Sequence, residues 1–542
     1  MLQYATVARE RIVGRAPQLR PGHPSYPWWV MAAISFAMIM SVLDSTIVNV
    51  AIAKLQVTFG ESTDAVQWVI TAYLLAFAVM LAASGWLADR FGYKPVFLAA
   101  VMLFTVGSFL CSISWSLSTL ILARIVQGIG GGMIGPVSMA IMMREFSKEK
   151  LGLAMGFFMI PALASSSFGP TLGGWLIDNF SWQMMFDVNV PIGIVGLFAS
   201  YVILRDHRAE GKHPFDFAGF ATIAVALGSL LLALADGNAE WNTDGWSSTF
   251  IVSCFAVSAA GFLLFFIIEF TTDHPLLDFS LFRNYNFSLS SVILFIFGLG
   301  IFGSDFLLPL YLQVGLGYTP TQAGMVFLPF GFVMIITGVI GGRLTDRIGA
   351  KIPGVVGILL RAYGMYRFTF LSAYSSNSQV ITTVLFLAAG MGFLMSPLQT
   401  TAIASISGAK AAQAGGLMQI IRQLGGSFGV AILSTILIQK EKLHLATAGQ
   451  DMSSWSPTFR EVLSHAYFIV MNASGGTASA AMSKGQSIIM AAVQKQSFVS
   501  AIDDVFYVAL LVSIVSSIPF LFLKTGRGRR AGKASAATPA LE

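Results

Sequence analysis

The stretch GWLADRFGYK, at Gly85–Lys94, decides the fold of this chain, because a closely similar stretch, GRLTDRIGAK, recurs at Gly342–Lys351. Each combines glycines with an Asp-Arg pair and a Lys, and each lies between two long apolar runs. Recurrence of a short polar motif in this setting is typical of membrane proteins built from repeated bundles. The chain is therefore predicted to contain two related halves.

The composition places the remainder of the chain in a membrane as well. Of its 542 residues, 55% are hydrophobic and 11% are charged, and the mean hydropathy is +0.74. Soluble domains carry about 25% charged residues. We predict an all-α integral membrane protein with fourteen apolar windows long enough to cross a bilayer, at about 28–50, 65–84, 95–113, 119–141, 152–177, 187–204, 217–235, 249–269, 287–312, 323–342, 352–372, 379–404, 412–439 and 499–523.

Basic residues concentrate in alternate connections, which predicts that both ends of the chain are cytoplasmic. The distance between the two repeated stretches leaves room for two extra spans between six-helix bundles. The predicted parts are a cytoplasmic tail (1–27), a first six-helix bundle (28–204), two inserted helices (205–270), a second six-helix bundle (271–523) and a cytoplasmic tail (524–542). A long polar segment outside the membrane, 440–498, is predicted as either a solvated loop or a docking surface for a periplasmic partner.

Several classes of function are not favoured by the sequence. It contains no GxxxxGK[ST] nucleotide-binding loop and no HExxH metal motif, and its two cysteines, Cys111 and Cys254, make no metal or disulfide framework. We therefore expect no enzyme activity, metal or cofactor. Transport energy would come from an ion or substrate gradient.

Two ionisable residues within apolar spans are the strongest functional candidates, because a charge in a span costs about 2.5–3.5 kcal/mol. Asp44 lies in LDSTIVNVAI and Arg124 in ARIVQGIGGG. A carboxylate that an arginine holds when ionised and releases when protonated couples proton flow to helix movement. A static ion pair that fixes helix packing is the alternative.

Further residues are predicted to line a substrate cavity, to form a hinge or to form a gating loop. Substrate-cavity candidates are Asn49, Gln127, Asp305 and Arg422, although Asp305 is equally suited to a local pair at the rim. Arg361 has no identifiable partner, and Arg367 is placed to extend toward the membrane surface. The hinge candidates in a kinked, tightly packed fifth span are Pro161, Gly169, Pro170, Gly173 and Gly174. The gating-loop candidates, with Glu145 as a partner of the basic residues, are Gly85, Asp89, Arg90, Gly92, Lys94, Asp346 and Arg347. A purely topological anchor is the alternative for the loop.

Taken together, these motifs resemble those of the major facilitator superfamily. GWLADRFGYK resembles its cytoplasmic loop signature, ARIVQGIGGG its fourth-helix signature and FGPTLGGW the fifth-helix signature of its antiporters. LDSTIVNVAI is similar to the first-helix signature of the fourteen-span drug/proton antiporters of the EmrB/QacA type. Further similar stretches lie at 182–193, 311–324 and 422–432, so the resemblance covers about 28–523. Asp187 and Arg361 depart from the family pattern.

The resemblance implies a major facilitator fold with proton coupling at Asp44 and Arg124, gating by Asp89 and Arg90, and a hinge at Gly169–Gly174. It also implies a periplasmic adaptor and an outer-membrane channel as partners, since EmrB-like members work with both. We expect a proton-driven exporter of drug-like compounds in the bacterial cytoplasmic membrane, without nucleic acid. The alternatives are a dedicated exporter of one natural product, such as a siderophore or antibiotic, and a membrane interaction protein that does not transport.

Overall fold

The computed structural model describes residues 18–523 apart from gaps at 19, 21, 49–50, 148–149, 208–213, 240, 274, 404–405, 407–409, 452–456 and 475–476. The described part is helical and contains no strand. In lipid, backbone N–H and C=O groups must find partners within their own segment, and a helix satisfies this requirement. The predicted all-α class is confirmed. The predicted tail 524–542 and most of 1–27 lie outside the described residues.

The first half packs around one helix, α6, which contacts α2, α4 and α5. Ser116 begins α6 with a capping box, in which its hydroxyl accepts from Thr119 N and the Thr119 hydroxyl accepts from Ser116 N. The helices of this half are α2 (Tyr26–Ile47), α3 (Ile52–Phe59), α4 (Thr63–Phe91), α5 (Tyr93–Ser112), α6 (Leu117–Glu145), α7 (Leu151–Asn179), α8 (Met184–Asp187) and α9 (Asn189–Ile203).

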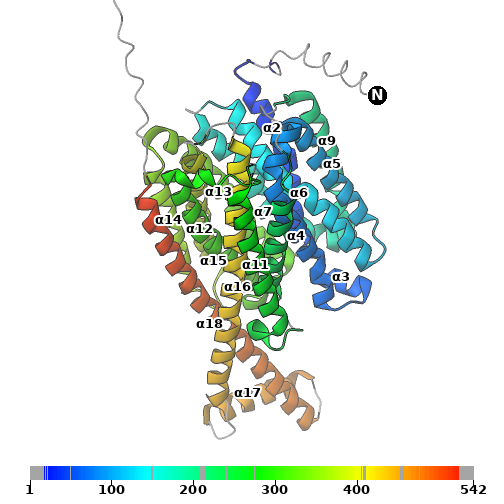
Figure 1. The fold of residues 1–542 in the computed structure, drawn as a ribbon. Coiled ribbons are helices and arrows are strands. Elements are labelled where there is room, and N and C mark those ends of the chain that lie inside the picture. Colours follow the sequence, from blue (N-terminus) through cyan, green and yellow to red (C-terminus); the bar gives the residue numbers. More distant parts are fainter. Residues whose placement is uncertain are drawn as a thin grey trace, which may run out of the picture.

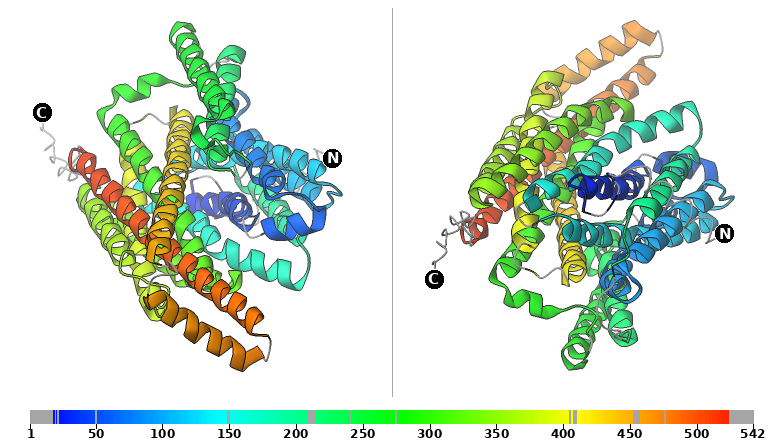
Figure 2. Two further views of the ribbon diagram at one scale, coloured as in Figure 1. Left: turned by 90° about the horizontal axis from the view of Figure 1, so that it is seen from below. Right: turned by 90° about the horizontal axis from the view of Figure 1, so that it is seen from above.

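The second half has the same kind of core, in which α12 packs on α16 and α15 packs on α13 and α14. Its helices are the 3-10 turn η5 (Phe279–Arg283), α12 (Tyr285–Leu310), the π turn η6 (Tyr311–Gly315), α13 (Pro320–Ile348), α14 (Lys351–Phe368), α15 (Asn377–Ile403), α16 (Ala411–Asp451), α17 (Pro457–Ser474) and α18 (Ala478–Leu521). Seen along the helix axes, the two halves lie side by side (Figure 2).

Two inserted helices, α10 (Phe217–Asp236) and α11 (Thr249–Thr271), lie at the margin of the molecule. They pair with each other, and α10 also packs on α4 and α16. Beyond the end of α10, the Asn238 amide donates to the hydroxyls of Ser434 (3.1 Å) and Thr435 (2.8 Å) on α16. The insertion is thereby attached to one helix of each half.

The segment 440–498, for which a solvated loop was one prediction, is largely helical. α16 continues to Asp451, α17 follows, and α18 begins at Ala478 and runs back into the bundle. These helices project from one end of the molecule, where α17 packs against α18 (Figure 1). The Ala, Gln and Lys of this segment are good helix formers as well as polar residues. Whether it is solvated or a docking surface stays a prediction.

Eleven helical segments within the described residues are long and apolar enough to cross a membrane. α7, α12 and α14 occupy the three remaining predicted windows. The protein is thus a multi-pass membrane protein, while the count of fourteen spans and the cytoplasmic position of both ends stay predictions.

The repeated stretch has a similar backbone in both halves, a tight helix-to-helix connection rather than an extended loop. Gly92 alone separates α4 from α5, and Gly349 and Ala350 separate α13 from α14. Gly92 ends α4 with φ 99°, and Gly349 ends α13 with φ 85°. A side chain is strained at such positive φ values, so glycine is required at both positions. The structure therefore confirms that the repeat is a structural one.

Candidate functional site

Asp44 and Arg124 form a buried ion pair in the first half. Their side chains come from α2 and α6 and are 0% and 1% exposed. The Arg124 Nη1 donates to Asp44 Oδ2 at 2.5 Å. The sequence prediction that these two residues meet is therefore correct, whereas their role in proton coupling stays a prediction.

Two amides complete the contacts of the Asp44 carboxylate. Gln127 Nε2 and Asn189 Nδ2 donate to Asp44 Oδ1 at 2.8 and 3.1 Å. Gln127 also accepts from Arg124 Nη1 at 2.6 Å through its Oε1 and donates to Ser108 Oγ at 2.6 Å. Asp44 accepts in all three of its contacts, as an ionised carboxylate does, because a protonated carboxyl would need an acceptor for its O–H. Added protons would have to break this set of contacts.

Arg124 has contacts that keep it in place beyond Asp44. Its Nε donates to the Val69 carbonyl at 3.0 Å. Its guanidinium carbon lies 4.1 Å from the centre of the Tyr73 ring and 5.7 Å from that of Phe186. Cation–π contacts of this kind favour arginine over lysine. Arg124 would stay anchored on α4 after its contact with Asp44 is lost.

The glycines after Arg124 allow α6 to approach its neighbours at backbone contact. A Cβ at Gly130 would lie 2.5 Å from Phe104 N on α5, and one at Gly132 would lie 2.3 Å from the Phe77 carbonyl on α4. Real Cβ atoms do not come this close to backbone, so only glycine fits here. The glycine run places the Arg124 side chain between α2, α4 and α8.

The predicted hinge helix, α7, passes through Pro161 and Pro170 without interruption. It lies against α2, where a Cβ at Gly169 would be 2.0 Å from Thr46 Oγ1 and one at Gly173 would be 2.6 Å from Ile47 Cγ1. The tight packing predicted from the sequence is present, next to the helix that carries Asp44. Gly174 is also buried. The hinge function itself stays a prediction.

The repeated stretches make contacts between the halves at the end of the molecule where α4 and α13 finish. In α13, Asp346 Oδ2 accepts from Leu153 N in the first turn of α7 at 2.9 Å. In α4, a Cβ at Gly85 would lie 3.1 Å from Gln413 Cγ of α16. Gly85 thus lies inside α4 and permits close packing, so its predicted place in a loop is wrong.

Within the first half, the stretch is held by a chain of polar contacts. Tyr93 Oη donates to Asp89 Oδ1 at 2.6 Å, and Arg144 Nη2 donates to Tyr93 Oη at 3.1 Å. Lys94 donates to the carbonyls of Tyr201 (2.5 Å) and Leu204 (2.8 Å). These carbonyls are at the carboxyl end of α9, where the helix dipole attracts a cation.

Glu145, predicted as the partner of Arg90 and Lys94, has other partners in the structure. Its carboxylate accepts from Arg205 Nη2 at 3.2 Å, and His207 Nε2 lies 3.4 Å from its Oε1; both partners are in the segment after α9. Sequence reasoning could not identify these partners because they depend on where α9 ends relative to α6. Arg347 lies in the last turn of α13, as Arg90 does in α4.

The remaining cavity candidates are in different places. Asn49 and the side chain of Asp305 lie outside the described residues. Arg422 lies on α16, where its Nε donates to Gln419 Oε1 at 3.2 Å. Arg361, predicted to seek an acid, donates from Nη2 to the Gly300 carbonyl at 3.0 Å, with its guanidinium carbon 5.9 Å from the centre of the Phe297 ring. The structure does not bring Arg422 into the Asp44 network.

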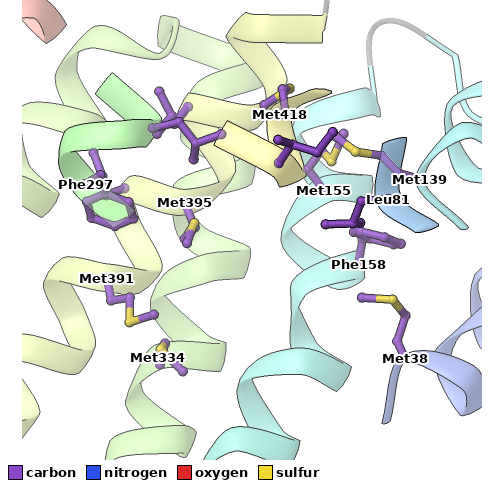
Figure 3. Close-up of a cluster of buried hydrophobic side chains, with 14 of the residues drawn as sticks. Met38, Leu81, Met139, Met155, Phe158, Phe297, Met334, Met391, Met395 and Met418 are labelled. Carbon is purple, nitrogen blue, oxygen red and sulfur yellow. The ribbon is translucent and has the colours of Figure 1, made fainter. Parts of the chain in front are cut away.

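Methionines are abundant in the central hydrophobic cluster. Met334 and Met395 belong to the second half, and Met38, Met139 and Met155 to the first, all at most 9% exposed. Figure 3 shows side chains of this cluster from both halves, with Met418 of α16 among them. Methionine is flexible and polarisable, so it adapts to partners of different shape.

Asn189, Tyr73 and Ser108 belong to the site although the sequence did not predict them. Asn189 lies in the stretch 182–193 that was singled out for its resemblance, and a buried Asn in an apolar helix start was the available signal. Tyr73 and Ser108 lie in apolar spans where such residues are ordinary. Only the packing of α4 and α5 on α6 shows that they face the ion pair.

Comparison with known proteins agrees with this architecture. Residues 34–430 match the Major Facilitator Superfamily. The chain is 34% identical over 405 residues to a multidrug resistance protein B homolog of Mycobacterium tuberculosis, covering 74% of each chain. It is 31% identical over 483 residues to the multidrug export protein EmrB of Haemophilus influenzae, covering 88% of this chain and 92% of that one. A proton:xylose symporter, XylE, shares the fold with a TM-score of 0.56 at 13% identity, over 93% of this chain and 97% of that one. The chain belongs to the major facilitator superfamily.

Proposed function

We propose that this transporter is a proton-coupled multidrug exporter, and the buried Asp44 network is the observation that carries the proposal. A membrane protein gains little from a buried ion pair that only packs, because removing charges from water costs several kcal/mol per ion. When all contacts of a buried carboxylate are with hydrogen-bond donors, protonation of that carboxylate must displace one of the donors. Binding of one proton at Asp44 neutralises it and removes its attraction for Arg124.

In this proposal Asp44 is the one group that binds and releases the transported proton. A proton from outside binds a carboxylate oxygen and displaces N–H donors of Arg124, Gln127 or Asn189 from it. Since Asp44 is on α2 and these donors are on α6 and α9, the helices are then free to shift. Loss of the proton to the cytoplasm re-forms the contacts. Substrate leaves in the opposite direction, which makes the cycle an antiport.

Alternating access is supported by contacts between the halves. The bond from Leu153 N to Asp346 and the packing of Gly85 on Gln413 hold the end carrying the repeated stretches together. We infer that this end is cytoplasmic and that both contacts open when substrate enters from the cytoplasm. The hydrogen bond from Leu153 N to Asp346 lies at an exposed helix start, where a capping contact contributes about 0.5–2 kcal/mol.

The substrates we propose are hydrophobic or amphipathic, including cationic compounds. The methionine-rich cluster between the halves supports this class, since thioethers adapt to apolar molecules of different shape. The names of the M. tuberculosis and H. influenzae relatives also refer to multidrug resistance or export. We place the protein in the bacterial cytoplasmic membrane on the same grounds.

A periplasmic adaptor, with an outer-membrane channel beyond it, is the partner that we propose for the projecting α16–α18 helices. This projection exposes apolar side chains, among them Phe468 (60%) and Ile469 (67%) on α17 and Ile488 (54%) on α18. Outside a membrane, exposed apolar side chains of this density favour a protein contact. Deleting 455–476 should leave dye transport in proteoliposomes intact while abolishing adaptor capture.

The test of proton coupling is efflux of ethidium from proteoliposomes under an imposed pH gradient. The wild-type chain is expected to extrude the dye, and collapse of the gradient or the substitution Asp44→Asn should abolish active extrusion. Asp178→Asn, which neutralises an exposed carboxylate at the end of α7, is the matched control and should transport normally.

Two outcomes would contradict the proposal. If Asp44→Asn still concentrates dye against its gradient in response to pH, Asp44 is not the coupling group. If the wild type moves no dye under any gradient although it binds a single natural product, the dedicated-exporter alternative replaces multidrug export.

A further inference from the structure

A pocket of about 260 Å³ lies where α14 ends, away from the Asp44 network. It is lined by Tyr363, Tyr366, Arg367, Phe370, Leu371 and Gln379. Arg367 comes 16 residues after Lys351, the first residue of α14. At about 1.5 Å per residue, this distance is about 24 Å, close to the thickness of a bilayer core. The pocket therefore lies at the opposite membrane surface from the repeated stretches.

Aromatic side chains form the walls of the pocket and face outward. Tyr363, Tyr366 and Phe370 are 46, 49 and 68% exposed. The Tyr366 and Phe370 rings meet edge to face with their centres 4.9 Å apart, and Tyr363 packs in the same way on Phe386. Exposed Tyr residues at a helix end are typical of the depth at which lipid headgroups meet the hydrocarbon. The pocket thus opens toward headgroups.

The polar groups of the pocket are hydrogen-bond donors. In the described part of the chain, no carboxylate lies within salt-bridge distance of Arg367. The Gln379 Oε1 already accepts from Ser376 N at 2.9 Å, which leaves the two N–H bonds of Nε2 for another acceptor. An arginine is also uncommon on the outer side of a membrane protein. A site built from a cation and an amide donor selects an anion.

An apolar surface runs from the membrane interior up to this pocket. Residues at intervals of four and three on α14 share one face, and their exposed fractions are 40–63%: Ile352, Val356, Leu359, Tyr363 and Tyr366. This face offers a path for an acyl chain that ends at Arg367. A soluble anion would make no use of it.

We propose that the pocket binds an anionic phospholipid, with its phosphate on Arg367 and Gln379 and an acyl chain along the exposed face of α14. The guanidinium fork matches phosphate oxygens, and the aromatic walls contact the glycerol region. A zwitterionic lipid offers the same phosphate together with its own ammonium group, which weakens the attraction. The proposal does not depend on the transported substrate.

The test is native mass spectrometry of the full chain in detergent, titrated with phosphatidylglycerol or phosphatidylcholine. One basic residue near a membrane surface contributes about 1 kcal/mol to anionic-lipid binding, so Arg367→Gln should weaken phosphatidylglycerol binding about fivefold. Arg367→Lys should retain part of the affinity. Lys54→Gln is the matched control, because Lys54 is an exposed base on α3 outside this pocket, and it should bind as the wild type does.

Three outcomes would overturn the assignment. The first is equal binding of phosphatidylglycerol by wild type and Arg367→Gln. The second is a wild type that does not distinguish phosphatidylglycerol from phosphatidylcholine. The third is stabilisation of the wild type against thermal unfolding by inorganic phosphate that is as strong as stabilisation by the lipid and is absent in Arg367→Gln. The ligand would then be a soluble anion.

Discussion

The two halves of the molecule share their helix packing and differ in how they use buried charge. In the first half, Asp44 and Arg124 are joined with two amides in one network. In the second half, Arg361 donates to the Gly300 carbonyl and Arg422 donates to Gln419. Duplication can preserve a packing scheme while one copy acquires the ion chemistry. We therefore expect proton coupling to depend on the first half.

The similarity is clearest at the glycines. Gly132 of α6 is placed against the Phe77 carbonyl, and Gly429 of α16 is placed against the Leu299 carbonyl, at Cβ distances of 2.3 and 2.1 Å. Both are helix pairs at backbone contact, one in each half. The contributions of helix packing and of buried charge can thus be tested separately, because the glycines determine the first and Asp44 and Arg124 the second.

The largest effect is expected from Arg124→Gln, which leaves Asp44 buried without its cation. Breaking a buried ion pair from one side costs about 3–5 kcal/mol. The double variant Asp44→Asn, Arg124→Gln should regain most of this stability because no unpaired charge remains, yet it should show no proton-driven transport. Denaturant unfolding and dye efflux on the same samples measure both quantities. A double variant as unstable as Arg124→Gln would show that packing rather than charge explains the loss.

Glycine substitutions should affect both halves alike, with a smaller effect. Gly132→Ala and Gly429→Ala each force a Cβ into a backbone carbonyl, and overpacking costs about 1–3 kcal/mol. Gly338→Ala is the control, since its Cβ would lie 3.9 Å from the Gly392 carbonyl, an ordinary contact. Thermal unfolding of the three variants checks this. A loss confined to Gly132→Ala would contradict the shared packing scheme.

This comparison also explains what the sequence could predict. The repeat at Gly85–Lys94 and Gly342–Lys351 was sufficient for two halves, because the glycine of positive φ that ends each helix is a local requirement. The Asp44–Arg124 pair was predictable because intramembrane charges are rare and need partners.

Contacts that depend on long-range packing were not predictable. Asn189 reaches Asp44 only because α9 packs beside α2. Glu145 pairs with Arg205 and His207 because the chain after α9 returns to α6. Polarity alone also did not distinguish the helical projection at 440–498 from a loop, since the same residues favour both.

A smaller effect is expected where the repeated stretches differ. Asp346 caps α7 of the other half, whereas Asp89 accepts from Tyr93 of its own stretch. Loss of a capping carboxylate costs about 0.5–2 kcal/mol. Asp346→Ala should therefore increase the distance between the start of α7 and the end of α13. Spin labels at positions 150 and 347 measure this distance. Asp89→Ala should leave this distance unchanged. Equal widening in both variants would contradict the difference between the stretches.

The smallest effect is expected from His207, which lies beyond the end of α9 with Glu145, Arg144, Arg205 and Asp206 around it. Burial lowers the pKa of His207 below its ordinary value of 6.5, and outweighs the opposing attraction of Glu145. The folded protein therefore prefers the neutral imidazole, so the associated stability is present above the unfolded-state pKa and is lost as pH falls through 6.5 toward the folded-state pKa.

His207→Asn should remove this dependence. Between pH 7.5 and 5.5, the unfolding temperature of the wild type should fall slightly more than that of the variant. His465→Asn, in the exposed projection, is the control and should follow the wild type. If the variant loses more stability than the wild type on acidification, the protonated imidazole is bound by Glu145 in the folded state, and the end of the first half that carries the repeated stretch is held by charge in the same way as its centre.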